Sequence, residues 1–199
     1  MKFICIGKNY AEHVKEMGWK DDHEIVLFMK PETAWCKSKL VPYPNFSNDL
    51  QYETELVIQL NQTLKNASVH QALSSIEKIS VGIDFTARDI QIELKKKGMP
   101  WEKSKSFDNS AVIGKWHPFH PGKEYEFSLQ LNNTEVQRGH SGMMMVHFAQ
   151  LVAEASKYFT IHPEDIIFTG TPQNVGSVHK GDVLSGYLEN EKVFEITIV

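Results

Sequence analysis

Residues 50–60, LQYETELVIQL, alternate between two kinds of side chain along their whole length. Six share one face and are mostly apolar: Leu50, Tyr52, Thr54, Leu56, Ile58 and Leu60. The opposite face carries Gln51, Glu53, Glu55, Val57 and Gln59. Because successive side chains of a strand point to opposite faces, this period of two favours a β-strand over a helix.

Short segments with strand or helix patterns follow one another along the rest of the chain. Strands are predicted over 3–6, 25–29, 79–85, 126–131, 135–137, 165–169, 183–188 and 193–199. Helices are predicted over 10–17, with Asn9 as its cap, and over 69–78, 87–97 and 142–158. Residues 98–110 form a polar loop between them. Many short strands with few helices predict a β-rich α+β fold. No repeat or linker divides the 199 residues, which suits a single domain over 1–199.

Composition excludes several classes of protein. Hydrophobic residues make up 41% and charged residues 23%, which is typical of a globular chain and excludes a disordered one. The apolar runs are too short to cross a bilayer, and the first residues, MKFICIG, are too short for a signal peptide. Cys5 and Cys36 are too few for a disulfide framework. We therefore expect a cytoplasmic protein with no membrane partner.

The charge pattern argues against nucleic acid as the main partner. The formal net charge is −4, and only Arg88 and Arg138 of the 21 basic residues are arginines. The glycine-rich loops that bind nucleotide phosphates are also absent from the sequence.

Three carboxylates are the first candidates for chemistry. Glu53 and Glu55 point from the same face of the predicted strand 50–60, and Asp84 points away from the apolar side of strand 79–85. If these two strands are neighbours, three hard oxygen ligands converge, which suits Mg²⁺ or Mn²⁺. The alternative is that the two glutamates belong to the solvated face of a half-buried strand.

A histidine and a lysine are the next candidates. His13 and Glu16 are three residues apart on the first predicted helix, so their side chains are within reach of each other. A carboxylate beside an imidazole fixes its tautomer and raises its basicity, which suits activation of water. The alternative is an exposed ion pair. Lys105 lies in the polar loop, where a lone lysine is most often solvated.

The remaining histidines and both cysteines have no clear catalytic pattern. His140 and His147 are too far apart on a helix to share a zinc ion, and His117 and His120 flank Pro118 in a loop. We interpret all four as structural or surface residues. Neither cysteine has a recognisable histidine partner, and no nucleophile elbow is present.

Several motifs, taken together and in order, give the chain a resemblance to a known family. They are IGKNYAEHVKEM, VLFMKPETA, YETELVIQL, GIDFTARDIQ, WEKSKSFDNSAVIG and IIFTGTPQNVG followed by KGD. From Gly7 to about Asp182 the chain resembles the fumarylacetoacetate hydrolase family, and in particular its short members of the acylpyruvate hydrolase and oxaloacetate decarboxylase type.

The resemblance implies a fold, a set of site residues and partners. The family fold is a mixed β-roll, usually a homodimer. By this resemblance Mg²⁺ or Mn²⁺ is held by Glu53, Glu55 and Asp84, and Lys105 acts on the substrate. The first helix acts as a lid that carries His13 and Glu16. The substrate site is lined by Gln91 and Thr171, and Arg88 is expected to support it from behind. The expected partner is a small 2-oxo acid.

Two departures from the family pattern leave the substrate open. Gly139-His140-Ser141 stands where relatives carry Gly-Asn-Thr or similar, and Tyr52 stands where relatives can carry histidine.

A 2-oxo acid chelates a metal through its carboxylate and keto oxygens, and the metal stabilises the enolate. Hydrolysis of an acylpyruvate, decarboxylation of oxaloacetate and keto–enol isomerisation all use this enolate, so the sequence leaves the three reactions open. The isomerase alternative would act on 2-oxo/2-hydroxy-dienoates. A binding module without turnover is the non-enzymatic alternative. The presence of His13, Glu16 and Lys105 beside the carboxylates favours the enzyme.

Overall fold

The computed structural model describes residues 1–18 and 26–199, and the largest sheet of this part of the chain has seven strands. Its order is β2-β1-β12-β5-β6-β8, and β9 pairs with the first half of β6, at Lys78 and Ile79. Only the β1–β12 pair is parallel. The strands are β1 Phe3–Gly7, β2 Val26–Lys30, β5 Thr54–Leu60, β6 Ile76–Asp84, β8 Ala111–Ile113, β9 His117–Pro118 and β12 Ile166–Phe168.

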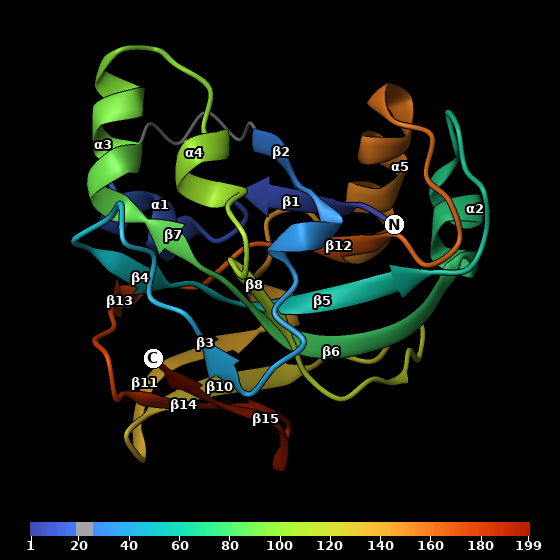
Figure 1. Ribbon diagram of the computed structural model, residues 1–199. Helices are drawn as coiled ribbons and strands as arrows, with labels where there is room; N and C mark the ends of the chain where they lie inside the picture. The colour runs from blue at the N-terminus through green and yellow to red at the C-terminus, as the bar shows by residue number, and fades with distance from the viewer. Residues whose placement is uncertain (19–25) are drawn as a thin grey trace.

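A five-stranded sheet packs against the large one, and Figure 1 shows it below β5 and β6. Its order is β11-β10-β14-β15-β3, antiparallel except for the β15–β3 pair. The strands are β3 Leu40–Val41, β10 Glu126–Leu131, β11 Thr134–His140, β14 Val183–Leu188 and β15 Glu191–Ile198.

A small three-stranded sheet and short helices complete the fold. The small sheet has the order β13-β4-β7, and its strands are β4 Leu50–Tyr52, β7 Thr86–Ala87 and β13 Gly176–Ser177. In Figure 1, α1, α3 and α4 lie together at one end of the large sheet, while α2 and α5 lie at the other. The α-helices are α1 Ala11–Glu16, α2 Val69–Ser74, α3 Arg88–Lys96, α4 Glu102–Lys105 and α5 Phe148–Tyr158. Two 3₁₀ turns cover η1 Glu32–Ala34 and η2 Ser141–Met143. The predicted fold class, a sheet-rich α+β roll, is confirmed.

The main core lies between the two large sheets and under α5. Leu56 and Ile58 of β5 join Phe127 of β10 and Leu151 of α5 in one buried cluster. Burial of such aliphatic side chains supplies most of the driving force for folding. The apolar face that the alternation predicted for 50–60 is therefore the core face, which leaves the glutamates on the other side.

The pairing of β5 with β6 brings the predicted carboxylate strands side by side. Thr54 pairs with Ile83 and Glu55 with Gly82 in an antiparallel register. The amide of Asp84 donates a hydrogen bond of 2.8 Å to the carbonyl of Glu53. The strand is interrupted at Glu53, so 50–60 forms β4 and β5 rather than one continuous strand. The amide of Thr54 donates to the side chain of Gln137 instead of to a strand partner.

Three helix predictions need correction. The helix expected over 69–78 ends at Ser74, because β6 begins at Ile76 and pairs with β5. The helix expected over 142–158 begins at Phe148. Asn9 explains this difference: its side chain accepts from the amide of Val146 and donates to the Val146 carbonyl, so both backbone groups of Val146 bond to Asn9 instead of to a helical turn. Asn9 therefore does not cap the first helix. Tyr10 occupies the N-cap position, and its side chain makes no capping hydrogen bond.

The loop prediction needs correction, whereas both hairpin predictions are confirmed. The loop expected over 98–110 contains the short helix α4. The hairpin around Asn132 and Asn133 is confirmed, and both residues have a positive φ, at 50° and 67°. The terminal hairpin is confirmed as well, although its second strand begins at Glu191. The strand expected over 25–29 corresponds to β2, while its first residue, Ile25, lies outside the described residues.

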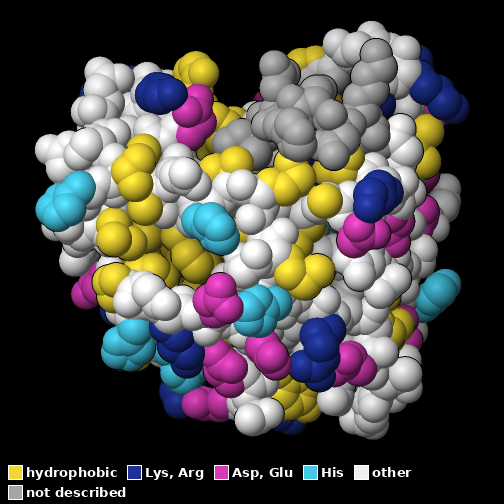
Figure 2. All heavy atoms as spheres, turned by 180° about the vertical axis from the view of Figure 1, so that it is seen from behind, with side chains coloured by type: hydrophobic (Ala, Val, Ile, Leu, Met, Phe, Trp, Pro, Cys, Tyr) yellow, Lys and Arg dark blue, Asp and Glu magenta, His cyan; other side chains and the backbone are white. Residues whose placement is uncertain are grey.

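The described surface has ordinary features. Helices of the described ranges are too short or too polar for any of them to cross a membrane. On the face seen in Figure 2, basic side chains of the described residues lie beside acidic ones and do not gather into one patch.

Candidate active site

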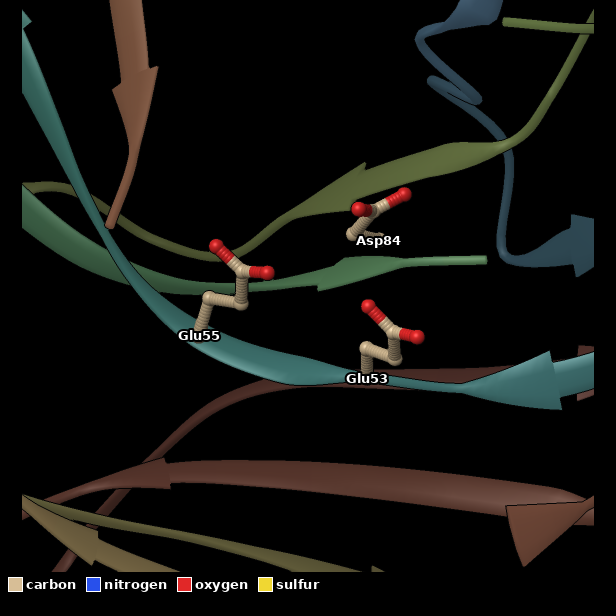
Figure 3. A group of neighbouring side chains, drawn as sticks. All are labelled: Glu53, Glu55 and Asp84. Atoms are coloured by element: carbon tan, nitrogen blue, oxygen red, sulfur yellow. The ribbon is translucent and has the colours of Figure 1, made fainter. Parts of the chain in front are cut away.

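Three buried carboxylates converge where β5 and β6 lie side by side. Glu53 precedes β5, Glu55 lies on β5, and Asp84 is the last residue of β6. One oxygen of each lies within 4.8 Å of the others, and Figure 3 shows the carboxylates turned toward a common space. Their exposed fractions are 6%, 2% and 1%, so the solvated-face alternative is wrong for these glutamates.

Three cations surround these carboxylates and balance their charge. The ammonium of Lys105 lies 2.7 Å from Glu53 Oε2 and 2.7 Å from Asp84 Oδ2. Arg88 binds Glu53 Oε1 through Nη2, and the ammonium of Lys30 lies 2.8 Å from Asp84 Oδ1. Lys105 is only 2% exposed, so its interpretation as a solvated loop residue is also wrong.

The pKa shifts follow from this arrangement. Burial by itself would raise the pKa of Glu53, but the charges of Lys105 and Arg88 outweigh it and hold that pKa well below its usual range. Burial raises the pKa of Glu55, and the neighbouring carboxylates Asp84 and Glu53 raise it further. Burial opposes the charge of Lys105, yet the two carboxylates raise its pKa above the ordinary lysine value. Glu55 is thus the carboxyl whose negative charge is least compensated by protein groups.

The residues fit a hard divalent cation on two counts. All three candidate ligands are carboxylates, which is the donor chemistry that Mg²⁺ and Mn²⁺ prefer. Asp84 Oδ1 is buried and receives no hydrogen bond. The ammonium of Lys30 forms an ion pair with this oxygen at 2.8 Å, but its geometry is not that of a hydrogen bond. A buried carboxylate oxygen without a donor is costly unless another positive group approaches it.

The histidine of the first helix lies in the same place. His13 is 3% exposed, and its Nδ1 is 2.9 Å from Glu16 Oε2. The exposed-pair alternative is therefore wrong, and the expected contact between the two side chains is confirmed. The other oxygen of Glu16 accepts a 2.9 Å hydrogen bond from the amide of Asn174, which ties α1 to the loop after β12.

Burial also sets the protonation of His13. It lowers the pKa of His13 below the ordinary histidine value, although Glu53 and the bond to Glu16 raise it in part. A carboxylate accepts hydrogen bonds, so Nδ1 carries the proton and Nε2 is the basic nitrogen of the ring. The imidazole is therefore largely neutral at neutral pH, as a general base must be.

One cavity connects most of the predicted site residues. Those that line it are His13, Glu53, Glu55, Gln91, Lys105 and Thr171. Arg88 lies behind this lining and donates hydrogen bonds to Gln91, Gln51 and Glu53. This position agrees with the expectation that Arg88 supports the substrate site from behind. The hydroxyl of Thr171 donates to the carbonyl of Thr54 and accepts from Gln137.

Two buried residues of this site are absent from the sequence-based predictions. Lys30, fully buried, binds Asp84 as well as the carbonyls of Phe85 and Ser110. The sequence signal that could have identified Lys30 is a lysine that ends an apolar strand and directly precedes Pro31. Gln137, 1% exposed, joins the amide of Thr54 to the hydroxyl of Thr171, and no local pattern distinguishes it.

The histidines expected to be structural lie away from this cluster. His140 and His147 cap or flank η2 and α5, and the Nε2 atom of His140 is 3.5 Å from Glu124. Within the described residues, the only group of three or more metal-ligating side chains found close together is Glu53, Glu55 and Asp84.

A sheet-rich roll that buries three carboxylates beside a lysine and a histidine–glutamate pair is an arrangement that could hold a divalent metal. The family model described as fumarylacetoacetate (FAA) hydrolase C-terminal matches residues 2–198. The chain belongs to this family, and the sequence-based resemblance is confirmed.

Relatives of known name and structure agree with this assignment. The chain is 38% identical over 192 residues to oxaloacetate tautomerase YcgM of Escherichia coli (strain K12), which covers 92% of this chain and 86% of the relative. A putative family member from Yersinia pestis CO92 has a similar structure, with a TM-score of 0.95 and 38% identity over 100% of this chain and 93% of that one. Fumarylpyruvate hydrolase from Pseudomonas aeruginosa, solved with Mn²⁺ and pyruvate, has a TM-score of 0.93 and 33% identity over 100% of this chain and 89% of that one.

Proposed function

We propose that this protein is a divalent-metal-dependent enzyme that interconverts the keto and enol forms of oxaloacetate. The observation that carries the proposal is the position of His13, a buried and largely neutral base that lines the same cavity as Glu53, Glu55 and Lys105. The 38% identity with an oxaloacetate tautomerase over 92% of the chain supports this choice among the reactions open to an enolate.

Glu53, Glu55 and Asp84 are the residues that would hold the metal, Mg²⁺ or Mn²⁺. When bound, such a cation supplies Lewis-acid polarisation of the substrate carbonyl. The Mn²⁺ and pyruvate in the Pseudomonas aeruginosa relative support a 2-oxo acid as the partner of this site. The homodimer expected from the resemblance stays a proposal, and the mass of the purified protein by light scattering tests it.

The side chains of this chain account for the proton movement. The Nε2 atom of His13 accepts a proton from C3 of the keto acid, and the electron pair of that C–H bond moves into the C2–C3 bond. The negative charge collects on the C2 oxygen, where the ammonium of Lys105 stabilises it. Glu16 holds the imidazole in the required tautomer and stabilises its protonated form. The protonated imidazole of His13 then gives this proton to the C2 oxygen, which yields the enol and restores the neutral ring, so no atom is gained or lost.

Hydrolysis of an acylpyruvate is the second candidate, and the His13–Glu16 pair favours it. The same nitrogen that takes a proton from carbon can take one from water, which would attack the C4 carbonyl and break the C3–C4 bond. The 33% identity with a fumarylpyruvate hydrolase supports this alternative. Decarboxylation of oxaloacetate needs the same enolate but no attacking water.

One set of assays separates these reactions. Enol oxaloacetate is added to the protein with Mg²⁺, and the fall in ultraviolet absorbance reports ketonisation. Acetylpyruvate cleavage and pyruvate release from oxaloacetate are followed in parallel. We expect ketonisation to be accelerated most and to stop with EDTA. Unaccelerated ketonisation with rapid acetylpyruvate cleavage would replace the tautomerase by the hydrolase, and full activity in EDTA would contradict both.

A further inference from the structure

The segment 170–174, which follows β12, connects the two halves of the site. The amide of Gly170 donates a 2.7 Å hydrogen bond to Glu55, one of the proposed metal ligands. Four residues further on, the amide of Asn174 donates a 2.9 Å hydrogen bond to Glu16 of α1. The position of this segment therefore bears on both the carboxylate cluster and the histidine–glutamate pair.

Glu16 depends on an outside contact for its orientation. It is the last residue of a six-residue helix, and 30% of its side chain is accessible to solvent. A glutamate in such a place has several side-chain rotamers open to it, and entropy favours their exchange. Its Oε2 atom lies 2.9 Å from His13 while Oε1 accepts from the amide of Asn174. The second bond thus favours the rotamer that faces the imidazole.

The side chain of Gln137 holds the segment 170–174 from behind. Gln137 lies on β11 and is 1% exposed. Its Nε2 atom is 3.0 Å from the hydroxyl of Thr171, 3.0 Å from the carbonyl of Pro172 and 3.2 Å from the carbonyl of Gln173. One carboxamide group therefore donates to three consecutive residues directly before Asn174.

The other end of the same carboxamide is fixed to the metal-ligand strand. Gln137 Oε1 accepts a 3.0 Å hydrogen bond from the amide of Thr54, the residue between Glu53 and Glu55. A backbone amide can only donate and a carbonyl can only accept, so these partners determine which end of the carboxamide is oxygen and which is nitrogen. Gln137 is not among the described residues that line the cavity. It can act on the reaction only through the groups that it holds.

We propose that Gln137 is a positioning residue that acts through the segment 170–174 on Glu16, and thereby holds the His13 imidazole in its Nδ1-protonated tautomer. This inference rests on the proposed function, because His13 is the base of that reaction. Without the donors of Gln137, the carbonyls of the segment turn to water, and the amide of Asn174 moves away from Glu16.

The metal ligands themselves should tolerate the loss of Gln137. Glu53 keeps its ion pairs with Arg88 and Lys105, and Glu55 keeps the amide of Gly170. The effect of Gln137 on the base is therefore separable from an effect on metal binding.

Two variants of different chemistry test the proposal. Gln137→Met keeps the length of the side chain and removes its hydrogen bonds. Gln137→Asn keeps the carboxamide but is one methylene shorter, so it cannot reach both Thr54 and the segment. Gln130→Met is the matched control, because Gln130 is a half-buried glutamine of the neighbouring strand β10 that accepts from the hydroxyl of Tyr187 at 3.3 Å.

The first two readouts need no turnover. Hydrogen exchange of the Asn174 amide should be about tenfold faster in both Gln137 variants, as expected for loss of one hydrogen bond. The ¹⁵N chemical shifts of the His13 ring, assigned with His13→Gln, should change from one tautomer to a mixture of two. Gln130→Met should match the wild type in both. Unchanged exchange and an unchanged tautomer in the Gln137 variants would overturn the proposal.

Kinetics then separate positioning from a general structural role. In Gln137→Met, kcat for ketonisation should fall about tenfold, while KM and the calorimetric affinity for Mn²⁺ change less than about threefold. In a Glu16→Gln background the same change should lower kcat by less than about twofold, because the group through which Gln137 acts is already altered. Full additivity of the two substitutions, or a loss of Mn²⁺ affinity as large as the loss of kcat, would overturn the proposal. If the wild type does not accelerate ketonisation but the exchange and tautomer change as expected, the proposed function fails and the positioning role stands.

Discussion

Lys30 and Asp84 form an ion pair of 2.8 Å between side chains that are 0% and 1% exposed. The ammonium of Lys30 also donates to the carbonyls of Phe85 and Ser110, 3.3 Å and 3.1 Å away. One cation thus joins β2, the end of β6 and the segment before β8. Asp84, the proposed metal ligand on β6, is thus held in place by a residue of β2, the strand at the opposite edge of the large sheet.

Removal of this cation should weaken folding strongly. Lys30→Met leaves a buried carboxylate with one fewer positive partner, and loss of one member of a buried pair costs about 3–5 kcal/mol in unfolding free energy. Urea unfolding followed by circular dichroism measures it. Lys192→Met is the control, since Lys192 forms a 2.6 Å pair with Glu195 that is largely exposed. A Lys30→Met protein as stable as the control would contradict a stabilising role for the buried pair.

Glu55→Gln should separate metal binding from folding. Because burial, Asp84 and Glu53 already raise the pKa of Glu55, a neutral side chain is tolerated there without the metal, and the melting temperature should not fall. Binding of Mn²⁺ measured by calorimetry should be lost with the ligand charge, together with nearly all activity.

Asp84→Asn and Glu53→Gln should behave differently from Glu55→Gln. They should abolish Mn²⁺ binding too, but they also leave buried cations unpaired and should lower the melting temperature. Unchanged Mn²⁺ affinity in all three variants would remove these residues as the ligand set.

Lys105→Ala should impair turnover of every substrate, since its charge faces the enolate whichever bond then changes. Loss of one charge-assisted contact costs about 1.5–3 kcal/mol, or roughly one to two decades in kcat/KM. The three assays of the proposed function measure this on one preparation. An unchanged kcat/KM for all substrates would limit Lys105 to holding Glu53 and Asp84 together.

His13→Ala should separate the reactions that need a base from the one that does not. Ketonisation and acylpyruvate hydrolysis should each fall by about 10²–10⁴-fold, the usual contribution of a general base. Oxaloacetate decarboxylation should fall much less, because it requires no proton abstraction. Glu16→Ala should give the same pattern in a milder form. A parallel fall of all three activities would assign the pair to lid closure or substrate binding instead.

The pH profile of kcat/KM should show an acid limb that belongs to His13. The base is active when neutral, so the rate falls as the pH drops through its pKa, which burial places below the ordinary value of about 6.5. The bond and charge of Glu16 raise that pKa in part, so Glu16→Gln should move the limb to lower pH. A limb that stays in place or moves upward in Glu16→Gln would contradict the assignment.

The sequence by itself determined which faces of the strands carry function. The alternation in 50–60 placed Leu56 and Ile58 in the core and Glu53 and Glu55 on the opposite side, and the three-residue spacing of His13 and Glu16 predicted their contact. These are local properties, because the period of a strand or helix fixes directions within one element.

Only the tertiary structure decided what those faces meet. Pattern alone left the glutamates and Lys105 as solvated residues or site residues, and burial between β5, β6 and α4 decided the question. The pairing of β5 with β6 also ended the predicted helix at Ser74, and Asn9 delayed the start of α5. Lys30 and Gln137 reach the site from distant strands. The sequence marks Lys30 only by its place between apolar residues and Pro31, and no local pattern distinguishes Gln137. The charge of a buried cluster depends on every group around it, and in this fold those groups come together only when strands far apart in sequence pair.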